Sequence, residues 1–149
     1  MVVYSLITTQ SNIQEAVYGR IRNINDVIEG ISGGTISQDQ KNTLLGQCYF
    51  FRAWCYYNIV KWYGGVPIVT ETMDPVVTSV IPRSSTKACI EFMLSDLDKA
   101  ATLLASKTMS GGWSGDDYGR VTTGTAQALK GRVLLLWASP IFNRANDES

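Results

Sequence analysis

The stretch from Tyr49 to Pro67, YFFRAWCYYNIVKWYGGVP, places the strongest constraint on how this chain can fold. It carries eight of the chain's fifteen aromatic residues within fifteen positions and then reaches Gly64-Gly65. A helix this rich in aromatic side chains cannot expose its whole circumference to water, because contiguous apolar surface is normally covered. The stretch therefore predicts a helix that is packed between neighbours.

Capping signals and apolar spacing predict four helices and no extended sheet. The aromatic helix starts at a capping box formed by Ser37 and Gln40 and stops at Gly64-Gly65. A similar box at Ser11, and hydroxyl caps at Ser85 or Thr86 and at Thr122 or Thr123, start the other three. The predicted helices cover residues 11–31, 38–63, 85–106 and 122–139. This order predicts a single all-α domain of antiparallel helix pairs, a tetratricopeptide-like α-solenoid.

A long irregular connector follows the second helix. The segment GGVPIVTETMDPVVTSVIP contains several β-branched residues and three prolines, which favour an extended course. We expect it to include a short strand at Val66 to Thr70. Connectors of this length are often functional.

A helical wheel of residues 38–63 predicts two adjoining buried faces. One face holds Leu44, Cys48, Phe51, Cys55, Ile59 and Trp62, and the other holds Tyr49, Ala53, Tyr56, Val60 and Tyr63. The remaining arc carries Phe50, Trp54 and Tyr57, a stripe that we expect to pack against another segment of the same protein or a partner.

Arg52 lies between the two buried faces, so we interpret it as a structural clamp. A buried guanidinium needs a partner. The candidates are Glu71, Asp74, Asp96 and the carbonyl groups at a helix end, and the sequence does not choose between them.

Composition excludes several classes of function. Thirteen basic and thirteen acidic residues give no net charge, which argues against a nucleic-acid partner. Histidine is absent, so Ser-His and Cys-His catalysis and His-ligated zinc are excluded. The acids show no converging spacing, and Cys48, Cys55 and Cys89 form no C-x-x-C pair, so we predict core thiols, no catalytic residues, no metal and no cofactor.

Four blocks along the chain, in order, resemble the SusD/RagB family. The pattern F-x-R-A-x-x-Y-x-x-x-x-x-x-Y-G-G-V-P runs through the aromatic stretch, and the other blocks precede or follow it with matching order. The blocks are Tyr18-x-x-Ile21 with Asn25, the aromatic stretch with Arg52-Ala53 and Tyr63-Gly64-Gly65-Val66-Pro67, then Pro82-Arg83-Ser84-Ser85, and Gly119-Arg120-Val121-Thr122. We interpret Arg52, Tyr63, Gly64, Gly65, Pro67, Arg83, Gly119 and Arg120 as the structural signature of that resemblance.

The resemblance implies a non-catalytic, surface-exposed lipoprotein of the outer membrane in Bacteroidota. Its expected partners are an oligo- or polysaccharide and a TonB-dependent, SusC-like transporter for nutrient uptake. Such proteins are longer than this chain and carry a lipid-anchor cysteine upstream, whereas the first cysteine here is Cys48 and no signal segment precedes it. We therefore expect this chain to be the helical portion of a longer protein. The alternative is a generic helical-repeat module that docks another protein.

The loop Ser110-Gly-Gly-Trp-Ser-Gly-Asp-Asp-Tyr118 has the composition of a sugar site, because aromatic faces lie beside polar groups. Trp113 and Tyr118 are the candidate glycan-binding residues. The alternative is that the tryptophan docks onto the core and the loop has no ligand. The pair Asp116-Asp117 lacks the spaced ligands of a calcium loop.

Overall fold

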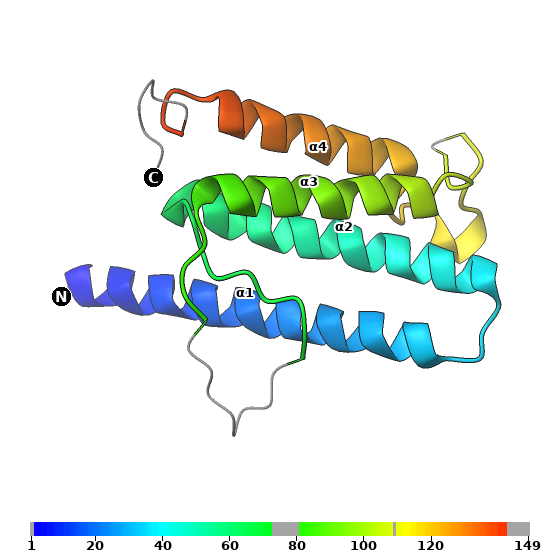
Figure 1. Cartoon of the computed structure of the whole chain (residues 1–149), viewed down its shortest axis with the longest axis horizontal. Coiled ribbons are helices and arrows are strands. Elements are labelled where there is room, and N and C mark those ends of the chain that lie inside the picture. The colour runs from blue at the N-terminus through cyan, green and yellow to red at the C-terminus, as the bar shows by residue number, and fades with distance from the viewer. Residues whose placement is uncertain (1, 73–80, 109, 143–149) are drawn as a thin grey trace.

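The computed structural model describes residues 2–72, 81–108 and 110–142, with side chains from Val17 onward. Its four α-helices are α1 (Val2–Gly33), α2 (Gln38–Tyr63), α3 (Thr86–Leu103) and α4 (Thr123–Ala138), and a 3-10 turn, η1 (Gly115–Asp117), precedes α4. Figure 1 shows them stacked side by side, with each helix antiparallel to the one before it. The predicted all-α architecture is confirmed.

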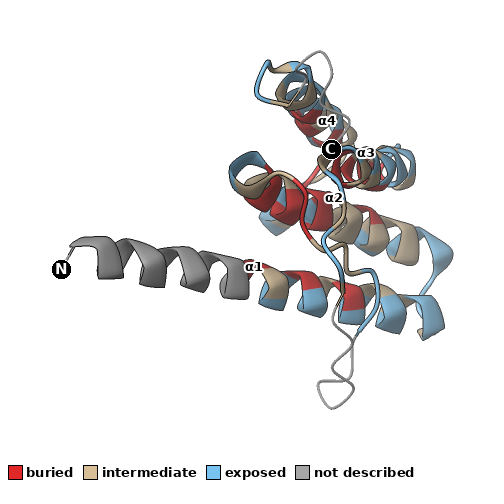
Figure 2. Cartoon of the chain, turned by 60° about the vertical axis from the view of Figure 1, so that its left-hand side comes forward, coloured by how far each residue is buried: buried red, intermediate tan, exposed pale blue. Residues whose placement is uncertain are grey.

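Helix α2 is the centre of the domain. It packs against α1, α3 and α4, while α3 also packs against α4. The buried residues line the facing sides of the helices in Figure 2 and form one continuous apolar core. The largest fully buried side chains include Tyr56, Ile21, Ile59, Met93 and Leu97. Among the described residues, no helix combines the length and apolar character needed to cross a bilayer.

The capping residues act as the sequence predicts at three helix starts. The Ser37 hydroxyl accepts the Gln40 backbone N–H while the Gln40 side chain accepts the Ser37 N–H, which completes the capping box of α2. Ser85 caps α3 through the Ala88 N–H, and Thr122 caps α4 through the Thr125 N–H. Local side-chain chemistry therefore fixes where these helices begin.

The predicted start of the first helix is wrong. Helix α1 begins at Val2 instead of near Ser11, so Ser11 lies inside the helix. No glycine or proline occurs between residues 2 and 18, so nothing in that stretch interrupts a helix. Helix α3 also ends at Leu103, three residues before the predicted residue 106.

The short strand predicted at Val66 to Thr70 is wrong too, because the described part of the connector is irregular. The connector leaves α2, crosses α1 and returns to α3 (Figure 1). Its backbone is held by side chains from α1 and α2, and one backbone hydrogen bond joins Ser84 N to Val66 O. Side-chain partners thus replace the neighbouring strand that a sheet would need.

The orientation of α2 about its axis differs from the predicted wheel. Phe50, placed in the exposed stripe, is buried with 7% of its surface exposed, while Phe51 and Trp62, placed in the core, are 47% and 74% exposed. Trp54 is exposed as predicted, at 40%. With apolar residues around most of α2, the sequence pattern does not fix the rotation. Instead, the contact of Gly46 with Leu104 and the burial of Arg52 set it.

Candidate functional site

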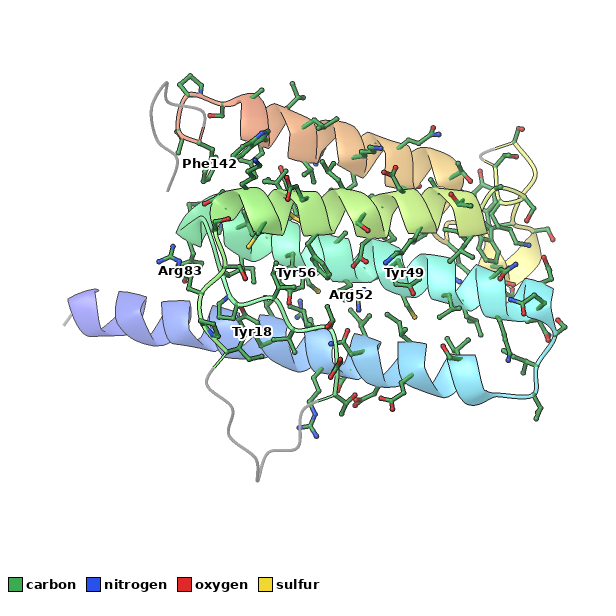
Figure 3. The ribbon with its side chains drawn as sticks, in the orientation of Figure 1. Tyr18, Tyr49, Arg52, Tyr56, Arg83 and Phe142 are labelled. Carbon is green, nitrogen blue, oxygen red and sulfur yellow. The ribbon has the colours of Figure 1, made fainter. Side chains whose placement is uncertain are left out.

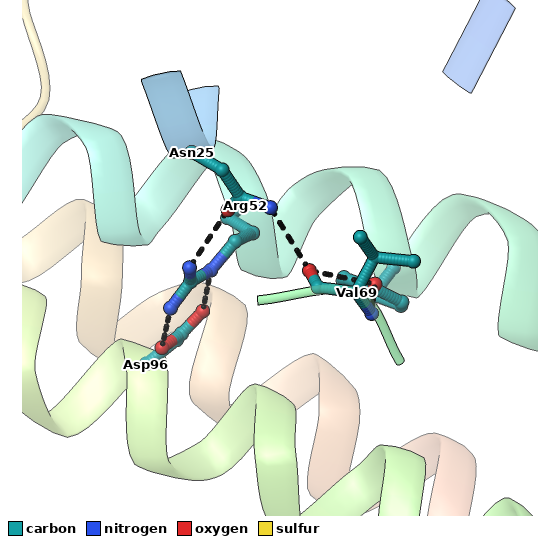
Figure 4. Close-up of polar contacts among 5 residues, drawn as sticks. Asn25, Arg52, Val69 and Asp96 are labelled. Atoms are coloured by element: carbon teal, nitrogen blue, oxygen red, sulfur yellow. Dashed lines mark hydrogen bonds and ion pairs between the residues drawn. The ribbon is translucent and has the colours of Figure 1, made fainter. Parts of the chain in front are cut away.

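Arg52 lies at a junction where three helices meet. Its Nε donates to Asp96 Oδ2 of α3 at 2.7 Å, and a second guanidinium nitrogen donates to Asp96 Oδ1 at 2.9 Å. Its Nη1 donates to Asn25 Oδ1 of α1 at 2.9 Å (Figures 3 and 4). The clamp predicted for Arg52 is present, and of the candidate partners it pairs with Asp96. Glu71 is exposed and Asp74 lies outside the described residues.

The junction is buried, and each side-chain nitrogen and oxygen atom of Arg52, Asn25 and Asp96 has a hydrogen-bond partner. Arg52 is 5% exposed, Asn25 is 3% exposed and Asp96 is fully buried. Tyr49 and Phe92 place their rings 5.3 and 5.2 Å from the guanidinium carbon, where their faces favour a cation. Burial opposes the charged form, but the hydrogen bonds and charge of Asp96 outweigh it and raise the pKa of Arg52. Arg52 therefore stays charged inside the core.

Asn25 extends the junction to the connector. Its Nδ2 donates to Val69 O at 3.1 Å, as Figure 4 shows, while its Oδ1 accepts from Arg52 Nη1. The Tyr56 hydroxyl accepts the Val69 N–H at 2.7 Å, and the Tyr18 hydroxyl donates to Pro67 O at 2.9 Å. Side chains of α1 and α2 thus hold the connector across the domain.

Burial keeps these two tyrosine hydroxyls protonated. It raises the pKa of Tyr56 to about 12 and raises the pKa of Tyr18 further. Both hydroxyls therefore keep their protons well above neutral pH and remain available as donors.

The turn after α2 requires its two glycines and is closed by Arg83. Gly64 has φ +68°, a conformation that favours glycine, and its N–H donates to Val60 O. A Cβ on Gly65 would lie 2.0 Å from Ser84 O, so only glycine permits this approach. Arg83 donates to the carbonyls of Tyr63 and Gly65, which end the helix, where a cation is favourable.

The loop between α3 and α4 brings the two glycan candidates into one cavity. A cavity of about 200 Å³ is lined by Trp113, Tyr118, Arg120 and three threonines, Thr108, Thr122 and Thr125. Tyr118 is 83% exposed, whereas Trp113 is half-buried and packs on the core. Asp117, beside them, pairs with Arg120 at 2.6 Å.

Trp113 is anchored in place. Its Nε1 donates to Val121 O at 2.9 Å, and Lys107 Nζ and the Arg120 guanidinium carbon lie 4.7 and 5.6 Å from its ring. Docking of this tryptophan onto the core, the alternative raised from the sequence, is therefore present. A glycan contact by Trp113 or Tyr118 stays a prediction.

The other residues that the sequence singles out, such as the cysteines and the aromatic residues of α2, do not line this cavity. Cys55 and Cys89 are buried in the core and Cys48 is half-buried, and burial raises the pKa of each thiol. Asp117 pairs with Arg120, and across the described residues no cluster of three acidic or cysteine side chains is placed to hold a metal ion. The rings of Trp54 and Tyr57 lie 6.1 Å apart on α2, with Trp54 40% exposed and Tyr57 half-buried against the core.

Sequence reasoning gave no role to several polar residues that build these sites. Asn25 interrupts the apolar stripe of α1 one turn after Ile21, and a polar residue at a core position signals a buried hydrogen bond. The role of Tyr56 in holding Val69 had no such signal, because its ring fits the predicted apolar face. Thr108 and Thr125 join the cavity only through the loop conformation.

The antiparallel helix pairs, with polar contacts joining three helices and the connector, define a helical-repeat scaffold. The sequence profile of a SusD-like family described as "Starch-binding associating with outer membrane" matches residues 3–135. That match covers most of the chain. This chain belongs to the SusD-like family, which is associated with the outer membrane.

Individual relatives agree with this assignment. A SusD-like protein of Formosa agariphila is 26% identical over 124 residues, which is 83% of this chain and 23% of the relative. A solved SusD-like protein from Bacteroides fragilis is 38% identical with a TM-score of 0.76, covering 84% of this chain and 23% of that one. A solved laminarin-binding SusD-like protein, 24% identical, has the same fold with a TM-score of 0.73 over 83% of this chain and 26% of its own. This chain therefore spans about a quarter of the length of these relatives.

Proposed function

We propose that this chain is the helical scaffold of a longer, non-catalytic SusD-like protein that captures oligo- or polysaccharide at the cell surface. In this proposal the complete protein works beside a TonB-dependent, SusC-like transporter in the outer membrane. The observation that carries the proposal is the family match over residues 3–135. SusD-like carbohydrate-binding proteins are non-catalytic.

The geometry supports a scaffold role for most of the signature residues. Arg52 donates hydrogen bonds to Asp96 and Asn25, and Arg83 donates to the carbonyl groups at the end of α2. Donors that are satisfied internally have little left for a ligand. Glycan contacts should therefore come from loops of this chain and from the remainder of the longer protein, as is common for binding residues on rigid scaffolds.

The test is glycan binding by the complete protein that carries this chain. Affinity gel electrophoresis would compare the protein's mobility in gels containing starch, laminarin or xyloglucan with its mobility in a glycan-free gel, with a non-binding reference protein in each gel. Calorimetry would measure binding of the same glycans. Laminarin is included because one structural relative binds it. We expect retardation by at least one of these glucans. A folded protein that binds none of them, nor any member of a wider polysaccharide array, would contradict the proposal.

A second candidate is docking of another protein onto α2. Phe51 and Trp54 are 47% and 40% exposed on one side of the helix, which is typical of a surface that meets a partner. Replacing both residues with serine in the complete protein distinguishes the two candidates. Glycan affinity would stay unchanged, whereas co-purification with an outer-membrane transporter would fall if this surface docks it.

A further inference from the structure

The family assignment does not say which residues of this chain would contact a glycan, and the cavity between Thr108 and Thr125 is a candidate. We propose that it binds one neutral sugar ring of a glycan, with Tyr118 stacking on the ring, and this inference rests on the proposed function. The cavity is lined by residues of the α3–α4 loop, which lies at the end of the domain near the start of α2 (Figure 1), whereas Arg52 lies in the middle of α2 (Figure 3).

The size and lining of the cavity favour a sugar. Its volume of about 200 Å³ is below the roughly 300 Å³ at which pockets for drug-sized ligands begin. Aromatic surface from Tyr118 and Trp113 lies beside the hydroxyl of Thr108 and the guanidinium of Arg120. An apolar ring face with hydroxyls around its edge, as a pyranose presents, matches both parts of this lining.

The charge of the cavity favours a neutral ring over an acidic one. Arg120 is the one charged residue among those lining the cavity, and Asp117 already pairs with its Nε at 2.6 Å. The two charges of this pair cancel, while the remaining guanidinium N–H groups can still donate to sugar hydroxyls. Lys107 Nζ lies 4.7 Å from the Trp113 ring centroid, but Lys107 is not among the residues that line the cavity. An acidic sugar would bring a carboxylate close to that of Asp117.

Tyr118, and not Trp113, is the side chain that is free to stack. Lys107 and Arg120 already occupy the surroundings of the Trp113 ring, at 4.7 and 5.6 Å from its centroid, and its Nε1 is bonded to Val121 O. Tyr118 is 83% exposed and follows η1 at the rim of the cavity. Trp113 therefore forms a fixed wall of the cavity, and Tyr118 presents an exposed ring at its rim.

The loop is shaped before any ligand arrives. A Cβ on Gly112 would lie 2.4 Å from Lys107 Cα, so glycine is needed where the loop folds back. Gly119 has φ +97°, next to Tyr118, and the Thr123 N–H donates to Lys107 O at 3.0 Å. A cavity that needs little ordering on binding loses less affinity to entropy.

A second hollow makes room for a longer glycan. It has a volume of about 330 Å³ and shares Trp113 and Arg120 with the first cavity. Its other wall includes Thr43 and Gln47 of α2, which offer further hydroxyl and amide groups. A chain of sugars can thus continue from the cavity over Trp113 toward α2, so affinity should increase from a disaccharide to a tetrasaccharide.

The test uses the complete protein and calorimetric titration with laminarin and xyloglucan oligosaccharides and with maltoheptaose. Tyr118→Ala should weaken binding of the preferred oligosaccharide about fivefold, since an aromatic contact of this kind is lost. Tyr118→Phe, which keeps the ring, should bind like the wild type. Trp62→Ala, a truncation of another exposed aromatic on α2, is the matched control and should not change the affinity.

Three outcomes are distinguishable. Weaker binding by Tyr118→Ala alone, with unchanged unfolding midpoints in all variants, supports the sugar site. Equal binding by the wild type and Tyr118→Ala overturns the site and leaves the proposed function intact. A wild-type protein that binds none of the oligosaccharides contradicts the proposed function and this site together.

Discussion

The Arg52 junction and the loop cavity use the same kinds of side chain in opposite ways. At the junction, Arg52 and Asp96 are buried, and their hydrogen bonds end within the protein. At the cavity, the Arg120–Asp117 pair has both side chains 49% exposed, and Tyr118 faces solvent. A buried arginine such as Arg52 therefore holds helices together, whereas an exposed arginine such as Arg120 remains accessible to a ligand.

Removing Arg52 should have the largest effect on the fold. Arg52→Met leaves the Asp96 carboxylate buried without a cation, which should cost about 3–5 kcal/mol of unfolding free energy. Urea unfolding followed by circular dichroism measures the loss. Arg120→Met, which removes the exposed pair, is the matched control and should lose much less stability. An equal loss of unfolding free energy in both variants would contradict the difference between the two regions.

A substitution in the turn beside Arg83 should cause the next largest loss of stability after Arg52→Met. Gly65→Ala pushes a methyl group against Ser84 O and should cost about 1–3 kcal/mol through displaced backbone. Gly131→Ala within α4 meets no neighbouring atom, and it should stabilise the domain by about 0.5–1 kcal/mol because alanine favours a helix. Thermal unfolding should show a lower midpoint for Gly65→Ala and a higher midpoint for Gly131→Ala. A Gly65→Ala variant with an unchanged midpoint would contradict the close approach of Gly65 to Ser84 O.

Tyr56 holds the connector through Val69 and gives the fold a dependence on alkaline pH. Burial raises its pKa to about 12, compared with about 10 for a free tyrosine. The folded state keeps a proton that the unfolded chain loses in this range. Its contribution is therefore complete below pH 10 and is lost as the pH rises toward 12.

The variant Tyr56→Phe isolates that contribution. It should lose about 1 kcal/mol at neutral pH because Val69 N–H loses its acceptor. The variant should also show a smaller fall in stability between about pH 9 and about pH 11. Urea midpoints at the two pH values measure both effects. An unchanged pH dependence would show that Tyr56 titrates normally.

The smallest effect should come from an exposed ion pair between α3 and α4. Lys130 Nζ lies 2.5 Å from Asp98 Oδ1, with side chains 36% and 60% exposed. Lys130→Ala should change the unfolding free energy by about 0–1 kcal/mol, because solvent screens such pairs. Repeating the measurement in 1 M salt should remove the difference, and a loss as large as that of Arg52→Met would contradict the role assigned to burial.

The sequence predicts the helices best where capping is local. Ser37, Ser85 and Thr122 each cap a helix start, and Gly64 ends α2. The start at Ser11 is wrong because a serine can also lie within a helix. A cap is therefore reliable only where glycine or proline also interrupts the chain nearby.

Tertiary contacts decide what the sequence leaves open. Phe50 and Phe51 are both apolar neighbours, so only packing against α3 and α4 decides which of them is buried. The choice of Asp96 over Glu71 as the partner of Arg52 depends in the same way on the crossing of α2 and α3. The sequence predicts Trp113 and Tyr118 as candidates from composition, but the contributions of Thr108 and Arg120 need the folded loop.

The central claim is that the Arg52 junction stabilises the fold and takes no part in glycan binding. The double variant Arg52→Met/Asp96→Leu in the complete protein tests it most directly. Replacing both partners removes the lone buried charge, so most of the stability lost in Arg52→Met should return. Affinity for the oligosaccharide that the wild type binds should be unchanged. A folded double variant that has lost glycan binding would contradict the account.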